Sequence, residues 1–81
     1  MDNGADSYYR FLDGDKNAFV EIIREYKDGL ILYIYGFVLN VDVAEELVAD
    51  TFIKIIVSKP RFRGKSTFKT WLYSIGCILR S

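Results

Sequence analysis

The segment K-P-R-F-R-G-K-S-T-F-K-T-W, from Lys59 to Trp71, holds the only proline and the only tryptophan of the chain. Five of its thirteen residues are Lys or Arg, and none is acidic. Three aromatic residues, Phe62, Phe68 and Trp71, stand among these cations. Cations that follow phosphates and rings that stack on bases are typical of surfaces for single-stranded nucleic acid. A solvated basic loop whose rings belong to the core would have the same composition. The rest of the chain is therefore needed to choose between a nucleic-acid surface and such a loop.

Charge is divided unevenly along the chain, although its 81 residues have no net charge. Residues 1–58 carry eleven acidic and five basic residues, a net charge of −6, whereas residues 59–81 carry six basic residues and no acidic one. Such asymmetry indicates two different surfaces on one protein. The basic part suits an anionic polymer, and the acidic part suits a basic protein partner.

Length and composition predict one small domain that spans residues 1–81. No apolar run reaches the ~18–20 residues of a membrane span, and no signal peptide opens the chain, so we expect a cytoplasmic protein without a membrane partner. A single cysteine and the absence of histidine argue against a disulfide and a metal site. Without histidine or a glycine-rich nucleotide motif, we expect no enzyme, no catalytic residue and no cofactor.

Apolar spacing predicts two helices in the first half of the chain. The first spans residues 6–13 and follows residues 1–5, which are polar and expected to be frayed. The second spans residues 16–39 behind an Asp15 cap, with apolar residues at spacings of three and four. After Gly29 nearly every side of this helix is apolar. It is therefore either a central helix of the bundle, which we favour, or a helix covered by a partner.

The third predicted helix begins at Asp42 and ends before Pro60, whose ring disfavours helical geometry at the preceding residue. The pattern D-V-A-E predicts a capping box between Asp42 and Glu45. The inward face comprises Val43, Ala44, Leu47, Val48, Thr51, Phe52, Ile55 and Ile56. The opposite face comprises Glu45, Glu46, Ala49, Asp50 and Lys54. This second face either keeps the helix solvated or docks on a partner. The sequence of this helix alone does not distinguish these two roles.

A fourth helix follows the basic loop of residues 61–65, with Ser66 or Thr67 as its cap. Its predicted buried face comprises Phe68, Trp71, Leu72, Ile75 and Leu79. No stop signal precedes Ser81, so we expect the chain to be part of a longer protein. No segment has the alternation of a strand. The sequence therefore predicts an all-α fold, a small bundle of three main helices plus a short N-terminal helix.

Three segments, in this order, resemble bacterial RNA polymerase sigma factors of the sigma-70 family, in its extracytoplasmic-function (ECF) branch. They are G-D-K-N-A-F-V-E-I-I-R-E-Y-K-D (Gly14–Asp28), D-V-A-E-E-L-V-A-D-T-F-I-K-I (Asp42–Ile55) and R-F-R-G-K-S-T-F-K-T-W-L-Y-S-I (Arg61–Ile75). The similarity covers about residues 12–79 and implies the fold of the second sigma domain. The family's other DNA-binding domain, which reads the minus-thirty-five element, has no counterpart in these residues.

The resemblance implies two binding surfaces. In the family, the acidic helix docks on a coiled coil of the largest subunit of core RNA polymerase. The corresponding residues are Glu45, Glu46, Leu47, Ala49, Asp50 and Lys54. The loop and the last helix recognise the minus-ten promoter element as unpaired non-template DNA. The corresponding residues are Arg61, Phe62, Arg63, Gly64, Lys65, Ser66, Thr67, Lys69, Thr70 and Tyr73. The resemblance assigns Trp71 to the core and adds an anti-sigma factor as a further candidate partner.

Two alternatives stand beside a sigma domain that binds core polymerase and melted promoter DNA in transcription initiation. One is a sigma-like protein–protein interaction module that has lost promoter recognition. The other is a helix-turn-helix protein, which needs a turn of ~3–4 residues, whereas seven residues, 59–65, separate the last two helices. Residues 76–78, G-C-I, stand where the family carries basic or amide side chains, which argues against promoter contacts from the end of the last helix.

Overall fold

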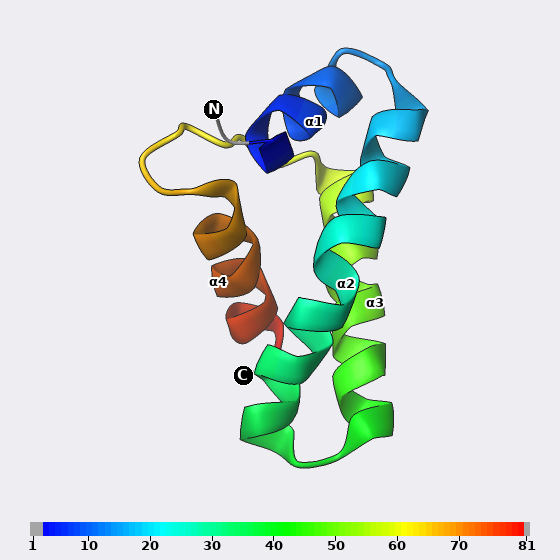
Figure 1. The fold of residues 1–81 in the computed structure, drawn as a ribbon, viewed down its shortest axis with the longest axis vertical. Coiled ribbons are helices and arrows are strands. Elements are labelled where there is room, and N and C mark those ends of the chain that lie inside the picture. The colour runs from blue at the N-terminus through cyan, green and yellow to red at the C-terminus, as the bar shows by residue number, and fades with distance from the viewer. Residues whose placement is uncertain (1–2, 81) are drawn as a thin grey trace.

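The computed structural model describes residues 3–80, and the side chains as far as Ile78, as four helices. α2 (Lys16–Val38) and α3 (Val41–Ser58) form a long antiparallel hairpin, α1 (Asn3–Leu12) crosses one end of it, and α4 (Phe68–Arg80) lies along one side (Figure 1). Residues 3–80 contain no strand, so the predicted all-α bundle is confirmed. None of the helices in this part of the chain could span a bilayer.

α1 begins at Asn3, three residues earlier than the sequence predicts. Residues 3–5, which the sequence predicts to be frayed, are part of this helix, while Met1 and Asp2 lie outside the described residues. Gly4 is buried, and a Cβ built on it would lie 2.6 Å from Cδ2 of Phe68. The absence of a side chain thus allows the start of α1 to approach the core closely, a contact that a polar sequence does not reveal.

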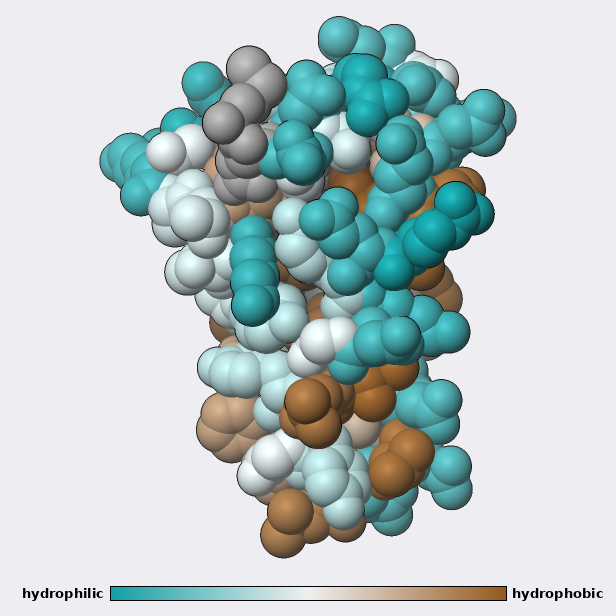
Figure 2. Space-filling view, in the orientation of Figure 1, coloured by the Kyte–Doolittle hydropathy of each residue, from teal (hydrophilic) through white to brown (hydrophobic). Residues whose placement is uncertain are grey.

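α2 follows its predicted course, but its second half is not central in the bundle. The Asp15 side chain accepts hydrogen bonds from the amides of Asn17 and Ala18, at 3.0 and 3.3 Å, and the helix continues through Gly29 without a break. Beyond Gly29 only two side chains, Leu30 and Ile34, are buried. Apolar residues gather over the lower half of the molecule in Figure 2. The large exposed ones in this region include Leu32, Tyr33, Tyr35, Phe37 and Leu39.

The N-cap of α3 lies two residues earlier than the capping box predicts. The Asn40 side chain accepts a hydrogen bond from the Val43 amide at 3.1 Å, whereas Asp42 lies in the first turn. Ala44, Val48, Thr51, Phe52 and Ile55 of the predicted inward face are buried. Leu47 is half-buried, and Val43 and Ile56 are 40% and 41% exposed, so the inward face is narrower than predicted.

α4 packs against the hairpin through a small residue and an aromatic cluster. Its cap is Thr67, whose Oγ1 accepts a hydrogen bond from the Thr70 amide at 3.2 Å. Phe68 and Leu72 are fully buried as predicted, and Trp71 and Ile75 are half-buried, while the predicted side chain of Leu79 lies outside the described ones. A Cβ on the buried Gly76 would lie 3.2 Å from Cδ1 of Ile34, so glycine permits the close approach of α4 to α2.

Candidate nucleic-acid and protein interfaces

The loop between α3 and α4 is held in place by two neighbouring tyrosines of α1. The Tyr8 hydroxyl donates a hydrogen bond to the Pro60 carbonyl, and the Tyr9 hydroxyl donates one to the Phe62 carbonyl at 3.1 Å. Tyr8 is fully buried, and burial raises the pKa of its hydroxyl to about 12. Gly64 turns the tip of the loop with a φ of 75°. The loop therefore has a defined path without helix or strand geometry.

Phe62 points into the core rather than to the surface. Its ring is only 6% exposed, and its centroid lies 5.2 Å from that of Trp71 and 5.7 Å from that of Phe68. We predicted Phe62 as a DNA contact. Core side chains cover most of its ring, and the small exposed part lines a hollow at the loop, beside Arg61 and Arg63. Two of the three aromatic residues that drew attention to this segment, Phe62 and Phe68, are thus structural.

A shallow hollow of about 200 Å³ opens beside the tip of the loop. Its walls include Arg61, Arg63, Lys65 and Ser66, and Trp71 also lines it. Trp71 is therefore both a core residue, as predicted, and a half-buried ring at a cationic hollow. Among the side chains that the structure describes, no carboxylate forms an ion pair with these three cations, since the ion pairs within residues 3–78 are those of Arg10. They are available to an external anion.

A second, larger groove of about 570 Å³ runs along α4, lined by Lys69, Thr70 and Tyr73 of the predicted set. Lys69 Nζ lies 5.4 Å from the centre of the Tyr73 ring, and partial burial raises the pKa of Tyr73. Tyr33 on α2 closes this groove from the other side, with its ring centroid 4.9 Å from that of Tyr73. Sequence reasoning missed Tyr33, because a regular apolar stripe gave no sign that it faces α4 at the surface.

The predicted DNA contacts therefore fall into two groups on either side of the start of α4. The loop hollow brings together residues 61–66, apart from Gly64, and the α4 groove brings together Lys69, Thr70 and Tyr73. Thr67 lines neither and acts as the helix cap, with its Oγ1 2.9 Å from Oγ1 of Thr70. The two hollows share no lining residue, so a bound strand would have to pass over the first turn of α4.

The acidic face of α3 is exposed, as its spacing predicts. Glu46, Asp50 and Lys54 recur every four residues and so lie on one side of the helix, and Glu45 and Ala49 flank them in solvent. Leu47 differs, because it is half-buried and packs against the core. Ion pairs to these carboxylates are absent among the described side chains. With three carboxylates and one lysine, the face therefore carries net negative charge, and none of the ion pairs among the described side chains involves it.

An apolar hollow of about 300 Å³ lies next to this acidic face, in the seam between α2 and α3. Glu45 and Ala49 form part of its lining, together with Ile53, which is 57% exposed, and Ile56. Sequence reasoning missed this hollow, although Ile53 lies outside the inward stripe of α3. An apolar residue outside the predicted buried face was the signal that could have revealed it.

Comparison with known proteins identifies the family. Residues 22–76 match the profile of Sigma-70 region 2. This chain belongs to the sigma-70 region 2 family. The match covers α2 from residue 22 on, all of α3, the basic loop and most of α4, and it leaves α1 and the start of α2 outside.

Several ECF sigma factors are similar to this region 2 protein. It is 37% identical over 66 residues to the ECF RNA polymerase sigma factor SigW of Bacillus subtilis, covering 82% of this chain and 35% of that protein. It is 36% identical over 66 residues to the ECF RNA polymerase sigma-E factor of Haemophilus influenzae, covering 82% of this chain and 34% of that protein. With the RNA polymerase sigma-H factor of Pseudomonas aeruginosa it shares 37% identity over 62 residues, which are 76% of this chain and 32% of that protein.

The chain spans about a third of the length of the curated relatives that it matches. No solved structure matches it closely enough to compare. The resemblance to ECF sigma factors inferred from the three sequence segments is thus confirmed, and the fold is the all-α one that the region 2 assignment requires.

Proposed function

We propose that this chain is a sigma-factor domain that binds core RNA polymerase and recognises the minus-ten promoter element as melted DNA in transcription initiation. Membership of the sigma-70 region 2 family supports a role in transcription initiation. The observation that carries the DNA part is the loop of unpaired cations around a hollow that Trp71 lines, held in place by Tyr8 and Tyr9. The domain binds and positions DNA, and the chemistry of RNA synthesis belongs to the polymerase.

In this proposal the loop and α4 divide two tasks between them. Arg61, Arg63 and Lys65 follow the phosphates, which positions the strand without reading its sequence. A base is read only after it leaves the stack, at a cost of a few kcal/mol. The loop hollow offers hydroxyl and backbone groups at Ser66 and the ring of Trp71 to such an extruded base. The α4 groove offers Lys69 and Thr70 to the next part of the strand.

The test uses a minus-ten oligonucleotide selected from random single strands on the complex with core polymerase. We expect Arg63→Ala and Lys69→Ala each to weaken binding of that strand about 5-fold, equivalent to ~1 kcal/mol for one lost phosphate contact. Fluorescence anisotropy measures the affinity. Arg24→Ala is the matched control, because Arg24 is an exposed cation of α2 that lines neither the loop hollow nor the α4 groove.

Equal affinity of wild type and both variants for the selected strand would contradict the assignment of DNA binding to the loop and α4. Failure to enrich any sequence, with binding to core polymerase intact, would favour the alternative of an interaction module that has lost promoter recognition. The exposed apolar side chains after Gly29 favour a protein partner for that part of α2 in either case, and an anti-sigma factor is the family's candidate.

The second part of the proposal is that the acidic face of α3 docks on core polymerase. Support comes from the exposure of Glu46 and Asp50 on one side of α3, with no ion pair to either of them among the side chains that the structure describes. Electrostatic attraction to a basic partner surface raises the association rate and orients the two proteins. The coiled coil of the polymerase largest subunit is the partner that the family resemblance implies.

Charge reversal tests the docking. We expect Glu46→Arg with Asp50→Arg to abolish co-purification with core polymerase, because both residues would then repel a basic partner surface. Since both side chains are exposed, the helical circular dichroism spectrum and the unfolding transition should not change. Co-purification at wild-type yield would remove the docking assignment.

A further inference from the structure

The α4 groove has one wall that belongs to α2. Gly29, Tyr33 and Phe37 recur every four residues along α2, so they lie on one side of that helix. A Cβ on Gly29 would lie 2.6 Å from the Tyr73 hydroxyl, so the glycine leaves the space into which Tyr73 of α4 extends. The ring centroids of Tyr33 and Tyr73 lie 4.9 Å apart. Glycine inside a helix is less favourable than alanine, and at this position it allows the two rings to meet.

Contacts on two sides orient the ring of Tyr33. Its hydroxyl accepts a hydrogen bond from the Cys77 thiol, with 3.5 Å between Sγ and the oxygen. Phe37 packs edge-on against the ring, with the centroids 5.2 Å apart and the ring planes at 77°. Tyr33 is nevertheless 39% exposed and lines the groove. These contacts therefore fix the direction of the ring and leave part of it open to a ligand.

The groove combines this aromatic surface with one positive charge and hydroxyl groups. Lys69 Nζ lies 5.4 Å from the centre of the Tyr73 ring, and Thr70 and Ser74 also line the groove. Among the described residues that line it, none is a carboxylate. Aromatic rings on which bases stack, beside a cation that attracts the phosphates, are the features of sites for single-stranded nucleic acid.

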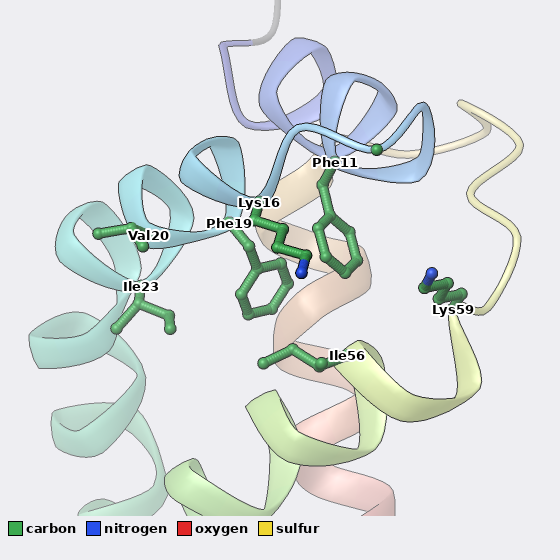
Figure 3. A pocket seen from close by; sticks show the side chains of 8 residues that line it. Phe11, Lys16, Phe19, Val20, Ile23, Ile56 and Lys59 are labelled. Carbon is green, nitrogen blue, oxygen red and sulfur yellow. The ribbon is translucent and has the colours of Figure 1, made fainter.

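A hollow of about 430 Å³ between α1, α2 and α3 also places cations beside rings (Figure 3). Lys16 and Lys59 line it, and Lys59 Nζ lies 5.7 Å from the centre of the Phe11 ring. The rings of Phe11 and Phe19 are buried, however, and they are the aromatic residues among those that line this hollow. It therefore offers no open ring to a base, whereas the α4 groove does.

Other exposed apolar residues in this half of α2 lie on a different side of the helix. Leu32, Tyr35 and Leu39 follow one another at spacings of three and four, and so share a side that does not include Tyr33 and Phe37. A protein partner is the candidate for that side. The side of Tyr33 instead continues the surface of the basic loop and α4.

We propose that the α4 groove holds a second unpaired base of the promoter strand, stacked on the rings of Tyr33 and Tyr73, so that Tyr33 of α2 is a base-contacting residue. This inference rests on the proposed recognition of melted DNA. The loop hollow takes one extruded base beside Trp71, and Lys69, in the first turn of α4, binds the backbone between the two bases. Every base has a face that can stack, so Tyr33 contributes affinity and a modest sequence preference.

Three variants test the ring of Tyr33 on the complex with core polymerase, using the selected single strand. Tyr33→Leu should weaken binding of that strand about 5- to 10-fold, because leucine has no ring on which a base can stack. Tyr33→Phe keeps the ring and should stay within about 2-fold of the wild type. Tyr35→Leu is the matched control, because Tyr35 is a 37% exposed tyrosine of α2 that does not line the groove. Fluorescence anisotropy measures each affinity, and circular dichroism checks the fold.

An abasic scan of the same strand identifies the base that lies on Tyr33. At one position, loss of the base should weaken binding to the wild type about 5-fold and cause no further loss in Tyr33→Leu, because both changes remove the same contact. At the other positions the two losses should multiply. The salt dependence of Tyr33→Leu should match that of the wild type, since no phosphate contact is lost. A merely structural role of Tyr33 would produce no coupled position and would overturn the inference.

Two glycine variants test the space for Tyr73 without changing a ring. Gly29→Ala improves helix propensity, but its methyl group must displace the Tyr73 hydroxyl. We expect no loss in thermal stability together with about 3- to 5-fold weaker binding of the strand, because the ring pair is disturbed. Gly36→Ala, with nothing within 4 Å of its Cβ, is the control and should bind like the wild type. Equal affinity of the two glycine variants would contradict the role of the ring pair.

The inference and the proposed function fail in distinguishable ways. Wild-type affinity of Tyr33→Leu, with binding still weakened by Arg63→Ala and Lys69→Ala, would confine the strand to the loop and α4 and overturn the inference. An equal loss in Tyr35→Leu would also overturn it, because the effect would then not depend on the groove. Wild-type affinity of Arg63→Ala and Lys69→Ala as well would remove the DNA-binding function itself.

Discussion

Gly4 and Gly36 both lie inside helices, and their surroundings predict opposite responses to a methyl group. A Cβ on Gly4 would meet the Tyr26 hydroxyl and Cδ2 of the fully buried Phe68, whereas a Cβ on Gly36 would meet nothing within 4 Å. In each case alanine also removes the conformational freedom that makes glycine unfavourable in a helix.

We expect Gly36→Ala to raise the free energy of unfolding by ~0.5–1 kcal/mol, because only the helix propensity changes. Gly4→Ala should lower it by about 1–3 kcal/mol, since the Phe68 ring cannot move without disturbing the core. Urea unfolding followed by circular dichroism measures both. Stabilisation by Gly4→Ala would show that α1 does not pack on Phe68 in this way.

Tyr8 predicts a loss of stability at alkaline pH. Its pKa is raised to about 12 by burial, from an ordinary value of 10 in the unfolded chain. Unfolding therefore releases a proton between these values, so the contribution of Tyr8 to stability is full below pH 10 and falls as the pH rises towards 12. Tyr8→Phe also loses the hydrogen bond to the Pro60 carbonyl, at ~1 kcal/mol. The variant should be less stable at pH 8, with a shallower decline above pH 10. Parallel pH profiles in urea unfolding would contradict this role.

At the scale of the elements, comparison of the predicted and observed helix ends shows which sequence patterns predict a helix boundary correctly. The sequence predicts the Asp15 cap, the end of α3 before Pro60, and a cap at Ser66 or Thr67, of which the structure selects Thr67, because a cap or a proline acts on its immediate neighbours. The start of α3 was not, since Asn40 and Asp42 offer competing caps two residues apart. The structure decides for Asn40 through its bond to the Val43 amide.

The α3 cap can be tested with one pair of variants. Asn40→Ala should lower the free energy of unfolding by ~1 kcal/mol, because the Val43 amide loses its acceptor. Asp42→Ala should cost only a few tenths, ~0.3 kcal/mol, from the weaker interaction of a first-turn carboxylate with the helix dipole. Thermal unfolding of the two variants gives the comparison. A larger loss of stability for Asp42→Ala than for Asn40→Ala would show that Asp42 is the N-cap of α3, as the capping-box pattern predicts.

At the scale of the whole molecule, the sequence predicts the helical bundle and the exposure of the acidic face. Prediction from sequence fails for features that depend on contacts between segments far apart in the chain. The burial of Phe62 depends on α1 and α4, and the early start of α1 depends on Gly4 meeting Phe68. The second half of α2 is apolar on all sides, and composition cannot tell which sides neighbouring helices cover. The apolar hollow between α2 and α3 escaped notice for the same reason, because it forms only when these two helices lie side by side.

The separation of charge between the two faces predicts how salt acts on DNA binding. If Arg61, Arg63, Lys65 and Lys69 each neutralise one phosphate, the logarithm of the affinity should fall with the logarithm of salt with a slope of about −3, at ~0.7 per phosphate on a single strand. Replacing one of them by alanine should reduce the slope by ~0.7. Anisotropy titrations at several salt concentrations measure it. If the salt dependence of affinity had the same slope in all four variants, these cations would not be the ones that contact the phosphates.

The tyrosine tethers from α1 have a consequence for the thermodynamics of recognition. Ordering one residue of a flexible loop costs ~1–2 kcal/mol of conformational entropy. Because Tyr8 and Tyr9 anchor the carbonyls of Pro60 and Phe62, much of that entropy is lost when the domain folds, before any ligand arrives. Preorganisation of this kind strengthens binding without a new contact. α1, which lies outside the region 2 match, would thus raise the affinity of the loop for a bound strand by holding the loop in place.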